Sequence, residues 1–439
     1  MLRVVSVVLL VSACASPAGG ETEGSSSAAE TTSGAPTSEG SGEASEATTS
    51  DELPDGCDVL VRGEVEGSEG LQAAIDGADA GARICVRGEF TGTATIGATG
   101  KSGLTITGIG DGESGLDGAV FEFGRAAGAP GFRFEDVEGL TLEHLTVRGT
   151  LGDGIVVSGG TDLKMVDVTV GWDGANTGAE LFAIRADNLT GVLIDGCEAS
   201  GGRDAGIFVQ QSRSVIVRDS RATGNVSGIE LENCAGAEVH DNTVSGNVIG
   251  LFVLDLPDTP FGNGGDVLVR DNTSDANNAV NFAEEGSVVA SIPAGIGALV
   301  LASDRVELRG NSFTGNDTTG VLVVSFAVVG LLSGMMFDDP GFDPYPQTIE
   351  IHDNRFAGNG TNPAELFASV FMLAMMPAIT WDGAADEMKD DPALRLCIRD
   401  NGDADFLNID ALDLGADKSP DLAPHDCDHP DVAPIDDGA

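Results

Sequence analysis

The chain has 439 residues, with 71 Asp and Glu against 22 Lys and Arg, and its formal net charge at pH 7 is −49. Because phosphate backbones are bound by basic surfaces, this charge excludes nucleic acid as a partner. Anionic polysaccharide is also disfavoured unless Ca²⁺ bridges it, and no acidic run has the spacing of an EF-hand or of nonapeptide Ca²⁺ repeats. We interpret the acidic surface as a solvated one suited to salty surroundings. No cofactor is expected, with the exception that the carboxylates are suitable ligands for Ca²⁺.

The N-terminus predicts a lipoprotein signal peptide over residues 1–13, because a short apolar stretch leads to Ser12-Ala13-Cys14. The stretch is far too short to span a membrane. We expect cleavage before Cys14 and lipidation of its thiol. Ala15 rather than Asp follows, which favours anchoring to the outer membrane, on its periplasmic or cell-surface side. Residues 14–56 are rich in Ser, Thr, Gly and Glu and hold no Lys or Arg, so they predict a disordered acidic tether.

From residue 57 to residue 410, a phrase of about 22 residues recurs and predicts an all-β fold, the right-handed parallel β-helix. Apolar strands open at Gly206, Gly228 and Gly250, which are 22 residues apart each time. One such unit cannot bury its own apolar face, so the units must stack as coils about 4.8 Å apart. Regular coils are expected from about 132 to 325. An amphipathic segment at 69–79 predicts a short helix that caps the first coil. A C-terminal cap and an acidic tail, 411–439, follow the coils.

Asparagine recurs at two fixed places in each unit. The second strands end at Asn242, Asn272, Asn311 and Asn354, and a further Asn follows each of them five residues later, at Asn247, Asn277, Asn316 and Asn359. Asn tolerates the left-handed backbone of a tight turn, and stacked Asn amides can hydrogen-bond from coil to coil. These residues are therefore interpreted as structural. Val244, Phe313 and Phe356 are expected to stack inside the column.

Six cysteines remain after lipidation of Cys14, in an oxidising compartment. Two pairs flank the caps, which predicts the disulfides Cys57–Cys85 and Cys397–Cys427. Cys197 and Cys234 fall at different phases of the repeat, which favours two buried free thiols over a third disulfide. The stretch from His425 to His429 contains ligand-like residues, but it lies in a Pro- and Asp-rich tail, and a metal site is the weaker interpretation.

Two apolar stretches, 324–347 and 366–381, interrupt the period. The uncharged run from 321 to 337 is slightly short for a membrane helix and has repeat units on both sides, so we reject a span. The outward positions of the first strands form a mostly apolar stripe, made of Phe208, Glu230, Phe252, Leu299 and Leu322. Such a stripe is unusual on the surface of a monomer. We expect the apolar insertions to fold over it, and the alternative is a stripe that contacts a partner protein.

Several segments together resemble a family of exported parallel β-helix repeat proteins over about 57–410. They are Gly206–Ser212, Gly228–Asn233, Leu254–Pro257, Asn281–Ala283, Ile292–Gly295, Phe342–Pro346, Ile351–Asn354, Trp381–Gly383 and Cys397–Asn401. The resemblance implies a lipoprotein or secreted protein and supplies no catalytic residues. The chain has Ala183-Ile184-Arg185-Ala186 where relatives tend to show Gly-Leu-Tyr-Pro, which puts in doubt any site that used that aromatic ring.

Most of the candidate catalytic residues lie in one loop. Gly341-Phe342-Asp343-Pro344-Tyr345 is similar to the Asp-Pro-His-Asp motif of mannuronan epimerases, but Tyr345 and Pro346 replace the groups that would move protons. For a lyase, Asp338, Asp339 and Asp343 would hold a cation and Tyr345, the only Tyr, would be a contact or a base. The structural alternative is a loop whose Asp residues cap turns. For a hydrolase, which needs paired carboxylates, Asp153, Glu180 and Asp204 precede first strands and are candidates.

The sequence therefore predicts a monomeric, lipid-anchored β-helix of the cell envelope that binds a glycan or an envelope protein, or has a structural role. Asp338, Asp339, Phe208, Glu230 and Phe252 are the candidate binding residues, and Asp343 and Tyr345 are the candidate catalytic ones. The alternative is a carbohydrate-active enzyme, a polysaccharide lyase, hydrolase or epimerase, that acts on its outer face. Fold alone does not decide between them.

Overall fold

The structure is a computed structural model that describes residues 53–110, 118–124, 129–172, 182–285, 287, 289–333, 338–386 and 391–436. The predicted signal peptide, the lipidation site Cys14 and all of the tether before residue 53 lie outside the described residues, as does Glu180.

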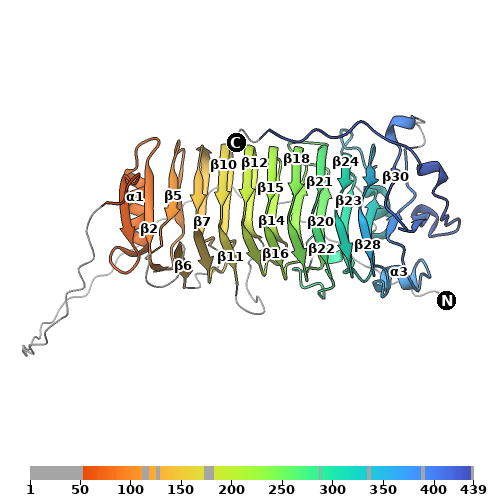
Figure 1. The fold of residues 1–439 in the computed structure, drawn as a ribbon, viewed down its shortest axis with the longest axis horizontal. Coiled ribbons are helices and arrows are strands. Elements are labelled where there is room, and N and C mark those ends of the chain that lie inside the picture. The colour runs from red at the N-terminus through yellow and green to blue at the C-terminus, as the bar shows by residue number, and fades with distance from the viewer. Residues whose placement is uncertain are drawn as a thin grey trace, which may run out of the picture.

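The chain winds into a column of coils, and each regular coil contributes one strand to each of three faces (Figure 1). All the strand pairs between coils are parallel, as the sequence predicts. The first face holds β4 (Ile96–Thr99), β7 (Phe132–Glu138), β10 (Ile155–Val166), β12 (Phe182–Asp195), β14 (Ala205–Gln210), β17 (Ser227–Glu232), β20 (Ile249–Leu254), β23 (Ile296–Leu301), β26 (Thr319–Val324), β29 (Ile379–Trp381) and β31 (Phe406–Asn408).

The second face includes the later halves of β10 and β12, which run through the corner between the two faces. Its other strands are β1 (Val59–Arg62), β2 (Arg83–Arg87), β5 (Thr105–Gly108), β8 (Thr141–Glu143), β15 (Arg213–Arg218), β18 (Ala235–His240), β21 (Gly265–Arg270), β24 (Asp304–Arg309), β27 (Glu350–His352) and β30 (Cys397–Arg399). The third face holds β3 (Glu89–Gly92), β6 (Ala119–Phe123), β9 (Leu145–Arg148), β11 (Thr169–Gly171), β13 (Glu198–Ser200), β16 (Arg221–Thr223), β19 (Thr243–Ser245), β22 (Thr273–Asp275), β25 (Ser312–Thr314) and β28 (Arg355–Ala357).

The interior is a continuous apolar core lined by alternate residues of every face. The rings of Phe313 and Phe356 stack with centroids 5.2 Å apart, as predicted. Val244 does not touch this pair directly in the register, because Ser274 occupies the coil between Val244 and Phe313.

Two ladders of buried Asn run through the turns. In each, the side-chain oxygen of one Asn accepts both the backbone N–H and the side-chain N–H of the Asn one coil earlier, as in Asn242 to Asn272 at 3.0 Å for both bonds. The left-handed backbone, however, belongs to the residue before the ladder Asn. Asp241 and Asp271 both have φ of 55°, whereas the Asn residues that follow them do not have positive φ. The expectation that the ladder Asn itself adopts this conformation is therefore wrong.

Both ends of the column are closed. Helix α1 (Gly67–Gly77) begins two residues before the predicted helix and buries Leu71 and Ile75 against the first coils. The disulfides Cys57–Cys85 and Cys397–Cys427 are both present, and Cys197 and Cys234 are buried and unpaired. Short 3-10 helices η1 (Val289–Ser291), η2 (Pro392–Leu394), η3 (Ala411–Asp413) and η4 (Ala423–His425) lie in the connections.

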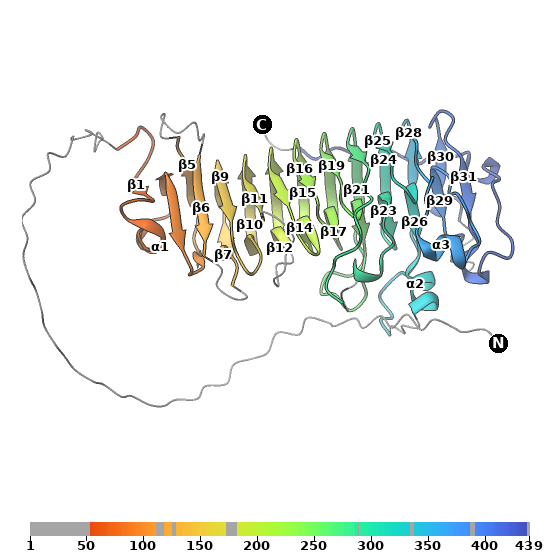
Figure 2. The ribbon, with the colours of Figure 1, turned by 90° about the horizontal axis from the view of Figure 1, so that it is seen from below.

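The apolar insertions fold over the outer side of the first face and form a second core. Phe252, Leu299 and Leu322 are buried there with Phe326 of α2 (Phe326–Ser333) and Phe367 of α3 (Glu365–Ser369). We call this cover the apolar cap; Figure 2 shows α2 standing off one side of the coils. Among the described helices, none has both the length and the hydropathy that crossing a membrane requires.

The C-terminal tail does not extend away from the molecule. After Cys427 it runs back along the column, and in Figure 1 it reaches from the C-terminal end toward β12. We call residues 428–436 the C-terminal strap.

Candidate functional site

The loop that carried the sequence-based catalytic candidates is held by its own Asp residues. The Asp343 carboxylate accepts the Tyr345 backbone N–H at 3.1 Å and the side-chain N–H of Gln347 at 2.7 Å. Asp339 accepts the backbone N–H groups of Asp258 and Gly341, which lower its pKa. These bonds support the interpretation of turn-capping residues, while Asp338 lies exposed at the start of the loop.

The ring of Tyr345 packs against the apolar cap, half-buried. Asn263 receives the Asp343 N–H and so joins this loop to the insertion after β20. Among the described residues, no group of three or more His, Cys, Asp or Glu is placed to hold a metal ion. His425 and His429 instead interact through their rings with the backbone carbonyls of Leu396 and Arg395.

A different set of side chains gathers where the apolar cap ends. The register places Arg185, Phe208, Glu230 and Phe252 on successive coils in one outward column. Phe252 lies under the cap, whereas Arg185 is half-buried on a more open part of the face. Glu230, 2% exposed, is the boundary between these parts.

Three further carboxyl groups belong to the same region. The charges of Asp204 and Glu232 act on Glu230, and the charge of Asp187 acts on Glu232. Glu232 lies two residues along the same strand and so points to the same side of the sheet. Asp204 lies just before β14, and its carbonyl accepts the Ser227 N–H at 2.7 Å. Asp187 is paired with Arg185 at 3.3 Å. We call Arg185, Asp187, Asp204, Glu230 and Glu232 the carboxyl cluster.

Burial controls the protonation of this cluster. Burial, and then the negative charge of Asp153, raises the pKa of Asp204 to about 7, although the Arg185 guanidinium opposes the shift. Burial and the charge of Asp204 raise the pKa of Glu232 to about 7 as well. For Glu230 the same two causes, in the same order, hold the pKa well above its usual range. Close to neutral pH, the cluster therefore holds carboxyl groups that can both donate and accept hydrogen bonds.

Nε of Arg185 is buried and lacks a hydrogen-bond partner among the described residues. Oε2 of Glu230 also makes no hydrogen bond of standard geometry there, although the Ser227 hydroxyl lies close enough to the Glu230 carboxyl to lower its pKa. Such atoms are rare in folded proteins because leaving them unpaired is costly, and a ligand is one way to satisfy them. The Arg185 guanidinium also lies 5.2 Å from the ring centroid of Phe182 and 5.9 Å from that of Phe208, and these two rings stack on each other. The cluster thus combines an acceptor, a donor and an aromatic wall.

Sequence reasoning found this place in part. It identified the outward column with Phe208 and Glu230. It also grouped Asp153, Glu180 and Asp204; the charges of Asp153 and Asp204 do interact, and Glu180 lies outside the described residues. It missed Arg185 and Glu232. The available signal was that Arg185 stands where the sequence departs from the family it resembles, and that Glu232 shares the face of Glu230 at a spacing of two.

Several of the segments that carry the family resemblance tie down loops rather than perform chemistry. The Asn281 side chain donates to the carbonyls of Val289 and Ile292 and closes the insertion before β23. Asp382 accepts the backbone N–H and the hydroxyl of Ser325 and the N–H of Ala384. These hydrogen bonds hold the insertions that cover the first face.

The chain is similar to one protein family and to several solved structures. Residues 130–261 match the family described as "right handed beta helix region". The A-module of the mannuronan C-5 epimerase AlgE4 of Azotobacter vinelandii is 17% identical, with 76% of this chain and 90% of that chain covered and a TM-score of 0.46. An alginate lyase from Paenibacillus sp. str. FPU-7 is 15% identical, with 69% and 97% covered and a TM-score of 0.42. The comparison with curated proteins gives no match. The parallel pairing of the strands and the family match over 130–261 together give this chain the fold of a right-handed parallel β-helix.

Proposed function

We propose that this β-helix binds a neutral glycan at the carboxyl cluster. The observation that carries the proposal is the buried Nε of Arg185, which has no partner among the described residues, beside Glu230 and carboxyl groups that are partly protonated near neutral pH. Sugar hydroxyls donate and accept hydrogen bonds, so they match such groups better than a polyanion does. The net charge of −49 opposes a polyanion further.

A glycan array read by direct binding tests this proposal. We expect neutral oligosaccharides to bind and uronic acid polymers not to bind. Glu232→Gln should weaken binding about tenfold, which corresponds to about 1.4 kcal/mol. The matched control is Asp343→Asn with Tyr345→Phe, in the loop favoured by the sequence, and this variant should bind as the wild type does. Equal loss in both variants, or no glycan bound at all, would reject the cluster as the site.

A hydrolase that uses the same cluster is the second candidate. Glu230 and Glu232 lie on one face of β17, and two residues along a strand span about 7 Å of backbone. Inverting glycosidases use a protonated and an ionised carboxyl group at roughly 6.5–9.5 Å, and the raised pKa of Glu230 favours it as the acid. New reducing ends would indicate hydrolysis, and new unsaturated ends that absorb in the ultraviolet would indicate a lyase. Binding without either product supports the binding protein.

We further propose that the protein acts at the cell envelope, anchored through Cys14 as the sequence predicts. Mass spectrometry of the mature N-terminus should find a diacylglyceryl Cys14, and Cys14→Ala should leave the precursor uncleaved. An envelope protein instead of a glycan would appear as a partner retained by the lipidated wild type and by Glu232→Gln alike.

A further inference from the structure

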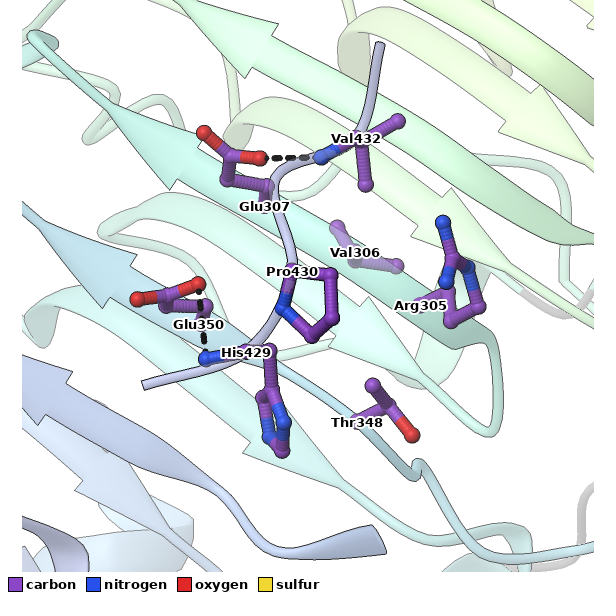
Figure 3. Close-up of a pocket in the computed structure, with 8 residues that line it drawn as sticks. All are labelled: Arg305, Val306, Glu307, Thr348, Glu350, His429, Pro430 and Val432. Atoms are coloured by element: carbon purple, nitrogen blue, oxygen red, sulfur yellow. Dashed lines mark hydrogen bonds between the residues drawn. The ribbon is translucent and has the colours of Figure 1, made fainter. Parts of the chain in front are cut away.

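The C-terminal strap is bound by glutamates that project from the second face. Oε2 of Glu350 accepts the His429 N–H at 3.3 Å, and Oε2 of Glu307 accepts the Val432 N–H at 2.6 Å (Figure 3). Oε2 of Glu238 accepts the Ile435 N–H at 2.8 Å. The three bonds fall on every third residue of the strap.

Each of these glutamates is also held from the other side by an arginine. Glu238 pairs with Arg270 at 2.7 Å, and Glu307 pairs with Arg309 at 2.8 Å. Glu350 pairs in the same way with Arg399 at 2.9 Å. The three glutamates are all 2% exposed. Because each arginine uses one carboxylate oxygen, the other oxygen is aimed at the strap, and a buried charge without that second partner would be costly.

The strap fits closely, and its hydrogen bonds to the glutamates use only its backbone. Pro430 and Pro434 lie between the bonded positions and have no N–H that needs an acceptor. Pro430 lies beside Val306 in Figure 3, and the cavity left around it is only about 10 Å³, room for at most one water. Leu268, which lies between Glu238 and Glu307 in the register, is fully buried. Glu238 and Glu307 lie two coils apart, which matches three residues of extended chain, whereas Glu307 and Glu350 lie on adjacent coils. The face therefore recognises N–H groups that are three residues apart.

We propose that this glutamate-lined face is a docking groove for an extended, proline-containing peptide, and that the strap of a second copy can occupy it in place of the chain's own strap. The strap follows the Cys397–Cys427 disulfide and ends the described chain, so it can leave without opening a coil. Contacts made by a second copy would be identical, and only the local concentration favours the chain's own strap. This is the arrangement from which domain exchange arises.

The test uses full-length protein and a fluorescent peptide of residues 428–436 as the second copy's strap. Val432→Pro with Ile435→Pro removes two of the bonded N–H groups and releases the strap. Ala433→Pro is the matched control, because its N–H makes no hydrogen bond with the described residues. By fluorescence anisotropy, the strap-released protein should bind the peptide at least about tenfold more tightly than the wild type or the control, in which the attached strap competes.

Adding Glu307→Leu to the strap-released protein should abolish peptide binding. No binding to a strap-released protein that keeps the wild-type circular dichroism spectrum would overturn the proposal. If that variant does not fold, hydrogen exchange of the wild type decides. Excess peptide should accelerate exchange at the Val432 and Ile435 amides and leave the coils unchanged, and no acceleration at saturating peptide would overturn the proposal.

Discussion

At the scale of single residues, the Asn ladders show how a repeated side chain becomes a structural element. Asn247 is fully buried, accepts two N–H groups of Asn225, and donates to Asn277 and to the Ala222 carbonyl. Both N–H groups of Asn225 therefore depend on Asn247 for their hydrogen-bond acceptor. Asn359 ends the same ladder and is only half-buried.

We expect Asn247→Ala to lower the free energy of unfolding by about 2–4 kcal/mol, because it leaves buried donors without acceptors. Asn359→Ala, the matched change at the end of the ladder, should cost about half as much or less, since water can replace the lost partner. Urea unfolding followed by circular dichroism measures both. Equal losses would contradict the argument that burial inside the ladder sets the cost.

Buried carboxyl groups make the stability of this protein fall as the pH rises. Burial raises the pKa of Asp382 from 3.8 to about 6, although three hydrogen bonds to Asp382 oppose the shift. The folded state then binds more protons than the unfolded state between these values. The associated stability is present below about pH 4 and is lost as the pH passes through about 6, which amounts to about 3 kcal/mol.

Thermal unfolding from pH 4 to pH 8 checks this sign. The wild type should lose stability across the range, with Asp204 and Glu232 extending the loss through about pH 7. Asp382→Asn should be less stable at pH 4 because its amide group faces an N–H donor, and its slope with pH should be shallower. A slope equal to that of the wild type would contradict the assignment to Asp382.

At the scale of elements, the apolar cap is a separate layer that packs against the outside of the coils. Phe342 packs edge-on against Phe326 of α2, with ring centroids 5.4 Å apart, and is 7% exposed. Because this contact lies within the insertion 324–347 and includes no residue of a coil, its loss should have a local effect.

Phe342→Ala should therefore cost about 3 kcal/mol in the stability of the cap. Hydrogen exchange should become faster in α2 and in the loop from 338 to 347, while β23 and β26 keep their protection. The matched change inside the column, Phe313→Ala, should instead accelerate exchange in the neighbouring coils. Uniform acceleration after Phe342→Ala would mean that the cap and the coils unfold as one unit.

The elements differ in how far the sequence predicts them. The repeat predicts the strands and the outward column, because a period of about 22 residues leaves one way to alternate inward and outward side chains. The two disulfides were predicted separately, from the cysteine pairs that flank the caps. Helix α1 was displaced by only two residues, since Leu71 and Ile75 mark its buried side. The sequence does not predict that the C-terminal strap binds to the second face. Its three bonds join Glu238, Glu307 and Glu350 to residues at the chain end, and they use backbone N–H groups that carry no residue signature.

The candidate site shows the same limit. The sequence marks Glu230 as an acidic residue in an apolar column, but the raised pKa of its neighbour Glu232 arises from burial. Burial there depends on where the apolar cap ends, which is a property of the folded insertions. The sequence therefore predicted the column, and it placed the candidate catalytic residues in a loop where Asp343 caps a turn.

At the scale of the whole molecule, the net negative charge destabilises the compact folded state. A net charge of −49 on this chain repels itself, and arginine–glutamate pairs along the second face offset only part of that repulsion. Screening shortens the range of such repulsion from about 30 Å at 10 mM salt to about 10 Å at 0.1 M. Added salt should therefore stabilise the folded state, in contrast to its usual weakening of isolated surface ion pairs.

We expect the melting temperature to rise by about 1–3 °C when NaCl increases from roughly 10 mM to 0.1 M, a gain of about 1–2 kcal/mol. Choline chloride, whose cation is too large for a carboxylate cage, is the control and should give the same rise, because screening depends on ionic strength alone. A rise produced by micromolar CaCl₂, with none produced by NaCl, would contradict diffuse screening and would instead require a dedicated Ca²⁺ site on the acidic surface.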